Sequence, residues 1–312
     1  MIGIRHPRRM LLYAGAALVG LLAIWFAVFI VPFVGANHGE AAQGTVTSKD
    51  GTNIAFERSG TGPAIVLVSA ALADRDGTSK LARHLAGKFT VINYDRRGRG
   101  KSSDTHPYAV EREVEDIDAL IDGAGGSAYL FGSSSGSVLA LEATDKLGNK
   151  VKGLSMYEPP FIIDDSHPPM PDEFSVQIEQ LVAAGRRSDA VKLFFTRGMG
   201  IPSGFVTMMR LLMPGWSKMV GMAHTIPYDL AVLAGTQTGK PLPARRWASV
   251  QAPTLVMVGG RSEAFFDTGA KALVASLPHA RYRVLEGRDH SAILMASQDI
   301  AAAVDEFFLS QN

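Results

Sequence analysis

The chain has 312 residues, of which 46% are hydrophobic and 20% charged, the composition of a globular protein with a sizeable core. Its formal net charge is +1 and it carries no long basic run, which argues against a nucleic-acid partner. It contains no cysteine, so disulfides, zinc thiolates and a cysteine nucleophile are excluded.

The N-terminal segment has the pattern of a membrane anchor. Residues 1–9 contain three arginines, and residues 10–36 are uncharged and mostly apolar. A membrane-spanning helix needs about 20 such residues, whereas a signal peptide core has about 7–15. A transmembrane helix is therefore predicted over residues 10–34, with residues 1–9 in the cytoplasm and the rest of this single-pass protein outside the cell membrane. The alternative is a long signal sequence, cleaved near the small residues 34–36 to release a secreted protein.

After a polar linker, residues 44–47 and 53–57 alternate in polarity on either side of Lys49-Asp50-Gly51, which predicts a β-hairpin. Continuous apolar runs and helix-like segments then follow one another. Strands are expected at 64–68, 90–94, 128–131 and 151–157, and helices at 81–85, 110–121 and 138–143. This alternation predicts a largely parallel, doubly wound sheet, with a core formed by residues 44–160 and 251–312.

Residues 161–250 interrupt the alternation. They show helical patterns at 174–184, 189–195 and 205–212, no strong strand, and a concentration of methionine and phenylalanine. A helical cap over the strand ends, where sites of α/β proteins form, is the expected structure. The core resumes with a strand at 253–260, a helix at 270–277, a strand at 281–285 and a last helix capped by Ser297, whose apolar positions are Ile300, Val304, Phe307 and Phe308.

A Gly-Ser-Ser-Ser-Gly pattern fills residues 132–136, between a predicted strand and a predicted helix. Glycines allow strand and helix to approach closely in a tight turn, and the free N–H groups of the helix N-terminus favour a developing negative charge. Ser134 is the predicted nucleophile, because only this serine has glycine two residues away on both sides. Registers centred on Ser133 or Ser135 lack that symmetry.

A serine hydroxyl is a poor nucleophile until a base removes its proton. Of the eight histidines, His290 is the best placed, because it follows the last predicted strand. The others fall beside the N-terminal segment, in helices or at their ends, in a loop, or in the 161–250 insertion.

Three motifs together resemble the α/β-hydrolase superfamily from about Thr45 to the C-terminus: residues 132–136, residues 95–102 and residues 287–290. The resemblance implies a mostly parallel eight-stranded sheet flanked by helices, and a serine esterase-like hydrolase that needs no cofactor and no metal. The motif at 95–102 resembles a structural loop of the family. A phosphate-binding loop would require glycine where Asp95 stands.

Two positions depart from the family pattern. Relatives usually carry His-Gly after the third strand, where this chain has Ser69-Ala70. Backbone amides do not depend on side chains, so the amides of Ala71 and Ser135 are the expected oxyanion donors.

The second departure concerns the acid of the triad. Ser262 stands where many relatives have an aspartate after the seventh strand. Glu158, at the end of the sixth strand, is the preferred acid, because a carboxylate there is costly to bury unless it is paired, and His290 would be its partner. Glu263 is the alternative and would need a one-residue shift of its loop. Asp267, which looks like a helix cap, and the absence of any acid remain open.

The expected function is hydrolysis of an ester-type small molecule, a carboxylic ester or lactone, through an acyl-enzyme. The methionine- and phenylalanine-rich insertion suggests an apolar substrate. Peptidase and carbon–carbon hydrolase activities use the same triad and remain open. The alternative from another class is a membrane-tethered ligand-binding or sensing protein with little or no turnover.

Overall fold

The computed structural model of the protein describes residues 41–171 and 173–310. The predicted cytoplasmic segment and the predicted transmembrane helix over residues 10–34 lie outside the described residues. Within the described part of the chain, every helix is too short or too polar to cross a bilayer.

One eight-stranded sheet organises the molecule, with the strand order β1-β2-β4-β3-β5-β6-β7-β8. The strands are β1 (Ala42–Thr47), β2 (Asn53–Ser59), β3 (Ala64–Val68), β4 (Thr90–Tyr94), β5 (Ala128–Ser133), β6 (Val151–Tyr157), β7 (Thr254–Gly259) and β8 (Ala280–Leu285). The β1–β2 hairpin and the β2–β4 pair are antiparallel, and the remaining pairs are parallel. The predicted hairpin and the predicted mostly parallel sheet are therefore confirmed.

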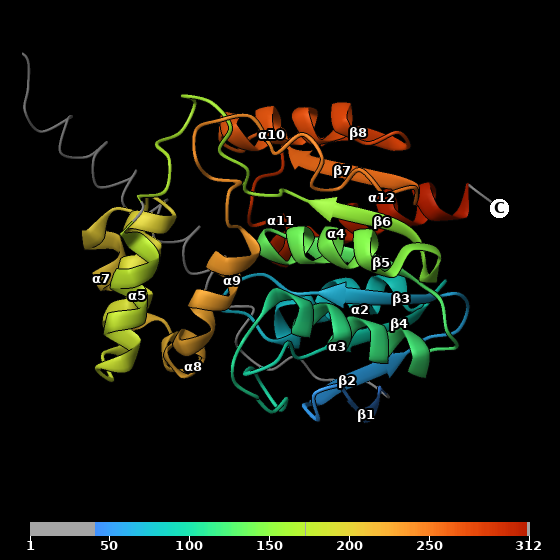
Figure 1. Ribbon diagram of the computed structural model, residues 1–312, viewed down its shortest axis with the longest axis horizontal. Helices are drawn as coiled ribbons and strands as arrows, with labels where there is room; N and C mark the ends of the chain where they lie inside the picture. The colour runs from blue at the N-terminus through green and yellow to red at the C-terminus, as the bar shows by residue number, and fades with distance from the viewer. Residues whose placement is uncertain (1–40, 172, 311–312) are drawn as a thin grey trace, which may run out of the picture.

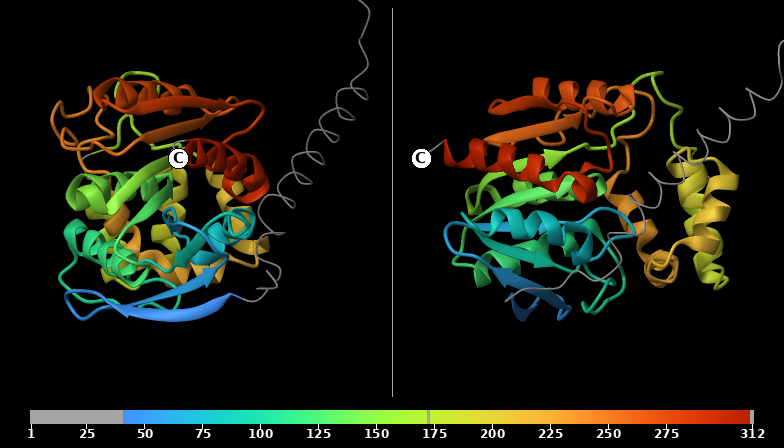
Figure 2. Two further views of the ribbon diagram at one scale, coloured as in Figure 1. Left: turned by 90° about the vertical axis from the view of Figure 1, so that its right-hand side faces the viewer. Right: turned by 180° about the vertical axis from the view of Figure 1, so that it is seen from behind.

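Helices cover both faces of the sheet, so its central strands are apolar on both sides. On one face lie α3 (Val110–Gly123), α4 (Ser135–Leu147) and α10 (Ala264–Ser276), and on the other lie α2 (Ser79–Leu85), α11 (Ala292–Met295) and α12 (Ser297–Leu309) (Figures 1 and 2). Strand β3 shows the twofold periodicity: Val66 and Val68 pack with the first group, Ile65 and Leu67 with the second.

A group of helices is inserted between β6 and β7, and it has an apolar core of its own. These helices are α5 (Phe174–Ala183), α6 (Arg187–Leu193), the π-helical turn η5 (Phe194–Gly198), α7 (Ser203–Leu212), α8 (Trp216–Met222) and α9 (Ile226–Val232). Figure 1 shows them beyond the carboxyl ends of β3, β6 and β7. The sequence patterns located α5, α6 and α7, but not α8 and α9.

Two details of the C-terminal part differ from expectation. Helix α10 begins at Ala264, several residues before its predicted start. Ser297 is the first residue of α12 and not its cap. Ala296 is both the C-cap of α11 and the N-cap of α12, without a capping side chain. The predicted capping role of Ser297 is therefore wrong, whereas the predicted apolar face of α12 is buried.

Candidate active site

Ser134 occupies a sharp turn between β5 and α4, as the strand–turn–helix pattern predicted. Its backbone has φ 53° and ψ −130°, a conformation that costs free energy for a residue with a Cβ. Its amide donates to the carbonyl of Tyr157 at the end of β6, at 2.9 Å. A Cβ on Gly132 would lie 2.4 Å from the carbonyl oxygen of Gly136, and one on Gly136 would lie 2.4 Å from that of Ser69. Both glycines are therefore required by the close approach of three backbone segments.

His290 pairs with Glu158. The ring Nδ1 lies 2.6 Å from Oε2 of the carboxylate. Glu158 is 0% exposed, and the histidine side chain is 35% exposed. The other carboxylate oxygen, Oε1, accepts from the amide of Gly259 at 2.7 Å and from the hydroxyl of Ser262. Each oxygen of the buried carboxylate thus has a donor, which is the condition under which a buried charge is tolerated.

The loop that carries His290 is held in place on both sides. The Phe266 ring stacks on the imidazole, with ring centroids 4.9 Å apart and planes inclined by 20°. The hydroxyl of Tyr157 donates to the carbonyl of Asp289 at 2.6 Å. Burial and the nearby charge of Glu158 raise the pKa of Tyr157, so it remains a donor. With Nδ1 engaged by Glu158, Nε2 is the ring nitrogen available for proton exchange.

The other two carboxylates considered from the sequence do not contact His290. The Glu263 side chain is 67% exposed, and its Oε2 lies 3.9 Å from Nε2 of His167. Asp267 lies inside α10, where it pairs with Lys271 at 2.7 Å and accepts from the Tyr282 hydroxyl. Its expected role as a helix cap is wrong, because Glu263 holds the N-cap position of α10.

Ala71 lies in the loop after β3 and lines the same cavity as Ser134. Neither its amide nor that of Ser135 has a hydrogen-bond acceptor among the residues that the structure describes. Within the same part of the chain, the non-glycine residues with positive φ are Leu72, Ser134 and Glu158, and all three belong to this site. The strained backbone positions of the described residues therefore lie in the loop after β3, in the Ser134 turn and at the end of β6.

Ser134 and His290 line one cavity of about 600 Å³, together with Ala71. The large apolar residues of its lining come mostly from the inserted segment and are Leu72, Phe195, Met199, Phe205, Met213, Met219, Met222, Phe266, Ile293 and Leu294. At its margin Lys218 of α8 pairs with Asp74 at 2.8 Å and Asp76 at 2.5 Å. In the described part of the chain, no three histidine, aspartate or glutamate side chains form a group that could hold a metal ion.

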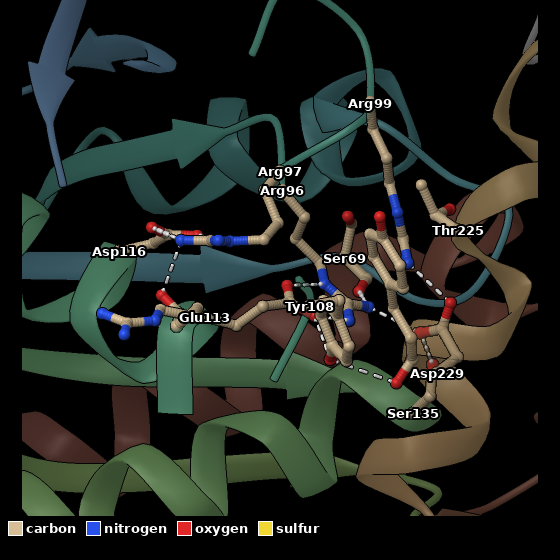
Figure 3. A network of polar contacts seen from close by, with 12 residues as sticks. Ser69, Arg96, Arg97, Arg99, Tyr108, Glu113, Asp116, Ser135, Thr225 and Asp229 are labelled. Atoms are coloured by element: carbon tan, nitrogen blue, oxygen red, sulfur yellow. Dashed lines mark hydrogen bonds and ion pairs between the residues drawn. The ribbon is translucent and has the colours of Figure 1, made fainter. Parts of the chain in front are cut away.

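Sequence reasoning missed the buried charges behind the Ala71 loop. Arg96 and Arg99 of the 95–102 motif meet Asp229 of α9, and all three are 1% exposed or less (Figure 3). The 95–102 motif contains both arginines, but their partner lies in the inserted helix α9, which no sequence pattern predicted. An acidic residue in an otherwise apolar helix was the available signal.

The model of the alpha/beta hydrolase family matches residues 65–303, and the chain belongs to this family. An alpha/beta hydrolase from Sphaerobacter thermophilus DSM 20745 is 49% identical, with a TM-score of 0.78, over 85% of this chain and 100% of that one. A stretch of 113 residues is 36% identical to the uncharacterized hydrolase YraK of Bacillus subtilis (strain 168), covering 35% of this chain and 42% of that protein, less than half its length. A thermophilic esterase from Thermogutta terrifontis shares the fold at 20% identity, with a TM-score of 0.61, over 86% of this chain and 99% of its own.

Proposed function

We propose that this hydrolase cleaves a carboxylic ester or lactone through an acyl-enzyme on Ser134. The observation that carries the proposal is the buried Glu158 carboxylate on Nδ1 of His290, in a site where His290 and the strained Ser134 turn line one apolar cavity. A serine, an imidazole and a carboxylate in these roles define a nucleophile, its base and the group that orients the base.

In the acylation step, Oγ of Ser134 attacks the carbonyl carbon of the substrate while Nε2 of His290 takes the hydroxyl proton. Glu158 stabilises the imidazolium that forms. The amides of Ala71 and Ser135, which have no other acceptor in the described part of the chain, donate to the oxyanion. The tetrahedral intermediate collapses when the bond to the leaving oxygen breaks and His290 returns the proton to that oxygen.

Deacylation repeats these steps with water as the nucleophile. His290 takes a proton from water as its oxygen attacks the acyl carbon, and then returns it to Oγ of Ser134 as the carboxylic acid leaves. For a lactone the alcohol and the acid remain one molecule, so a hydroxy acid is released.

The cavity favours an apolar acyl or alkyl group of moderate size. Its volume of about 600 Å³ lies within the usual range for small-molecule sites. Six of its lining residues are methionines or phenylalanines of the inserted segment, and methionine side chains adapt to irregular apolar shapes.

Labelling by a fluorophosphonate probe tests the nucleophile, with Ser134→Ala as the control. Labelling that disappears in the variant supports the proposal, and p-nitrophenyl butyrate, octanoate and palmitate together with a lactone series then define the substrate. Without labelling or turnover of any ester, the proposal fails, and the ligand-binding or sensing alternative takes its place.

We further propose that the apolar run at residues 10–36 anchors the protein in the cell membrane, with the hydrolase domain outside the cytoplasm. Fractionation of the full-length chain with a C-terminal tag tests this proposal. Recovery with membranes after a carbonate wash supports an anchor, and a shortened chain in the medium indicates a cleaved signal sequence. Full-length protein in the cytosol contradicts both.

A further inference from the structure

Asp229, on the inserted helix α9, joins two segments of the core, the 95–102 motif and the start of α4. It is 1% exposed, and its Oδ1 accepts from Nη1 of Arg96 at 2.6 Å and from the hydroxyl of Ser135 at 2.8 Å. Its Oδ2 accepts from Nη2 of Arg99 at 2.5 Å. Figure 3 shows this aspartate between the two arginines and Ser135. The side chain therefore contacts the first residue of α4 directly.

The two arginines extend the contact to the loop that carries Ala71. Nη1 of Arg99 donates to the carbonyl oxygen of Ala70 at 2.7 Å and to that of Ala73 at 3.2 Å, and Nη1 of Arg96 donates to that of Ser69 at 3.2 Å. The carbonyl of Ala70 and the N–H of Ala71 belong to one planar peptide group and point in opposite directions. Fixing the Ala70 oxygen therefore fixes the direction of the Ala71 N–H.

The charges of this cluster balance. Arg96 also makes two hydrogen bonds of 2.7 Å to the carboxylate of Glu113, so two arginines face two carboxylates. Burial disfavours the ionised form of Asp229, but Arg96 and Arg99 hold its pKa below the usual range. An ionised aspartate is thus present at neutral pH, and removing it leaves one buried positive charge uncompensated.

We propose that Asp229 is a positioning residue for both oxyanion donors: through Arg99 it sets the Ala70–Ala71 peptide, and through the Ser135 hydroxyl it sets the start of α4. The inserted helices then supply part of the catalytic geometry as well as the wall of the cavity. This inference rests on the proposed function, because it assigns a role within the oxyanion site.

The test is Asp229→Asn in the full-length protein, assayed with the best p-nitrophenyl ester. Oxyanion donors act mainly in the transition state, and loss of one typically costs about 10²–10³ in rate. Misdirected but present donors should cost less, so we expect kcat to fall about 10- to 100-fold, with KM changed less than about threefold. The Kd of a boronic acid that forms a tetrahedral adduct with Ser134 should rise with the loss in kcat.

Asp116→Asn is the matched control. Asp116 is 0% exposed and pairs through both oxygens with Arg97, at 2.7 and 2.8 Å. The hydrogen bonds of Arg97 go to Asp116, Asp50 and the carbonyl of Arg112, and none goes to the Ala71 loop. This variant also neutralises a buried carboxylate that pairs with an arginine, and its kcat should stay within about twofold of wild type because Arg97 does not contact the Ala71 loop.

Ser135→Ala keeps the inference testable if Asp229→Asn does not fold. It removes only the hydroxyl on Asp229 and keeps the arginine pairs and the Ser135 amide, so kcat should fall about three- to tenfold at constant KM. The inference is overturned if kcat is unchanged in both variants, if KM rises instead, or if Asp116→Asn loses as much kcat as Asp229→Asn. A wild-type protein that the fluorophosphonate does not label removes the proposed function, and the inference with it.

Discussion

Replacing Glu158 by glutamine changes one atom of the site and should nearly abolish turnover. The amide of Gly259 and the hydroxyl of Ser262 both donate to Oε1 of Glu158. These donors will hold the oxygen of a glutamine in that place and direct its NH₂ group at Nδ1 of His290, where Oε2 lies at 2.6 Å in the wild type. An NH₂ group donates, so Nδ1 must accept and the ring proton must move to Nε2. A ring protonated on Nε2 cannot take the proton of Ser134.

The size of the effect follows from this reversal. In enzymes with a serine nucleophile and a histidine base, a wrong histidine tautomer, together with the lost charge opposite the imidazolium, costs about 10⁴ in kcat. With the glutamine held by two donors, we expect a loss of about 10³–10⁴, equivalent to about 4–5.5 kcal/mol in the barrier. Because glutamine is isosteric and Glu158 is fully buried, the cavity and KM should change little.

The assay is ester turnover together with the rate of fluorophosphonate labelling, and both should fall. Glu263→Gln is the comparison, since its side chain is 67% exposed and contacts His167. Thermal unfolding shows whether each variant is folded. A folded Glu158→Gln protein within tenfold of wild type, or an equal loss in Glu263→Gln, would refute the assignment of Glu158 as the acid.

Three further variants test the surroundings of the site. Gly136→Ala places a Cβ 2.4 Å from the carbonyl oxygen of Ser69. It should lower the free energy of unfolding, measured in urea, by at least about 1–3 kcal/mol. A decrease below about 0.5 kcal/mol would contradict the close approach. Ser262→Ala removes a donor to Glu158 and should lower kcat about tenfold at constant KM, whereas a rise in KM alone would speak against it. The pKa of Asp229 is lowered, so its charge stabilises the fold above about pH 4 and ceases to do so as pH falls through the folded-state value. The Tm difference between wild type and Asp229→Asn should therefore stay constant down to about pH 4 and shrink below it, and a difference that does not change below about pH 4 would argue against a stabilising charge.

The sheet was predictable because its strands are short apolar runs bounded by turn residues. Strands β3, β4 and β6 occupy the predicted residues. A strand that is buried on both faces appears in the sequence as a continuous apolar run, which is easily recognised. The inserted helices α8 and α9 escaped prediction for the opposite reason. Each has only 7 residues, too few on their own for a clear helical period. Helix α6 is as short, but the pattern that predicted it continues into the helical turn that follows directly. The apolar residues of α8 pack within the insertion, whereas those of α9 are divided between the insertion and the main core.

The residues of the candidate site that follow strands of the sheet could be predicted from the sequence. Ser134, His290 and Glu158 all follow parallel strands, whose carboxyl ends meet at one edge of the sheet. Asp229 was not predictable in this way, since its position depends on how an inserted helix docks. The capping roles expected for Ser297 and Asp267 were wrong because a short polar side chain near a helix start fits several positions of the first turn.

Glu158 after β6 and Ser262 after β7 contact each other. Strands β6 and β7 are parallel neighbours, and the amide of Glu158 donates to the carbonyl of Met257 at 2.9 Å. The two strand ends therefore lie side by side, and the hydroxyl of Ser262 contacts Oε1 of Glu158. A carboxylate arising from residue 262 would place its carboxyl carbon near that hydroxyl and its oxygens near the present Oε1. A carboxylate at position 262 would therefore lie next to the oxygen of Glu158 that now contacts His290.

Exchanging the two residues tests this argument. Glu158→Ser alone should lose about 10³–10⁴ in kcat, and adding Ser262→Asp should recover about tenfold or more of the loss, because a charge again faces Nδ1 of His290. Ser262→Asp alone should be destabilised, since two carboxylates would share one buried site. Turnover and Tm of the single and double variants form a double-mutant cycle. If the second substitution lowers kcat further in the Glu158→Ser background, residue 262 does not reach the imidazole, and the two strand ends are not interchangeable.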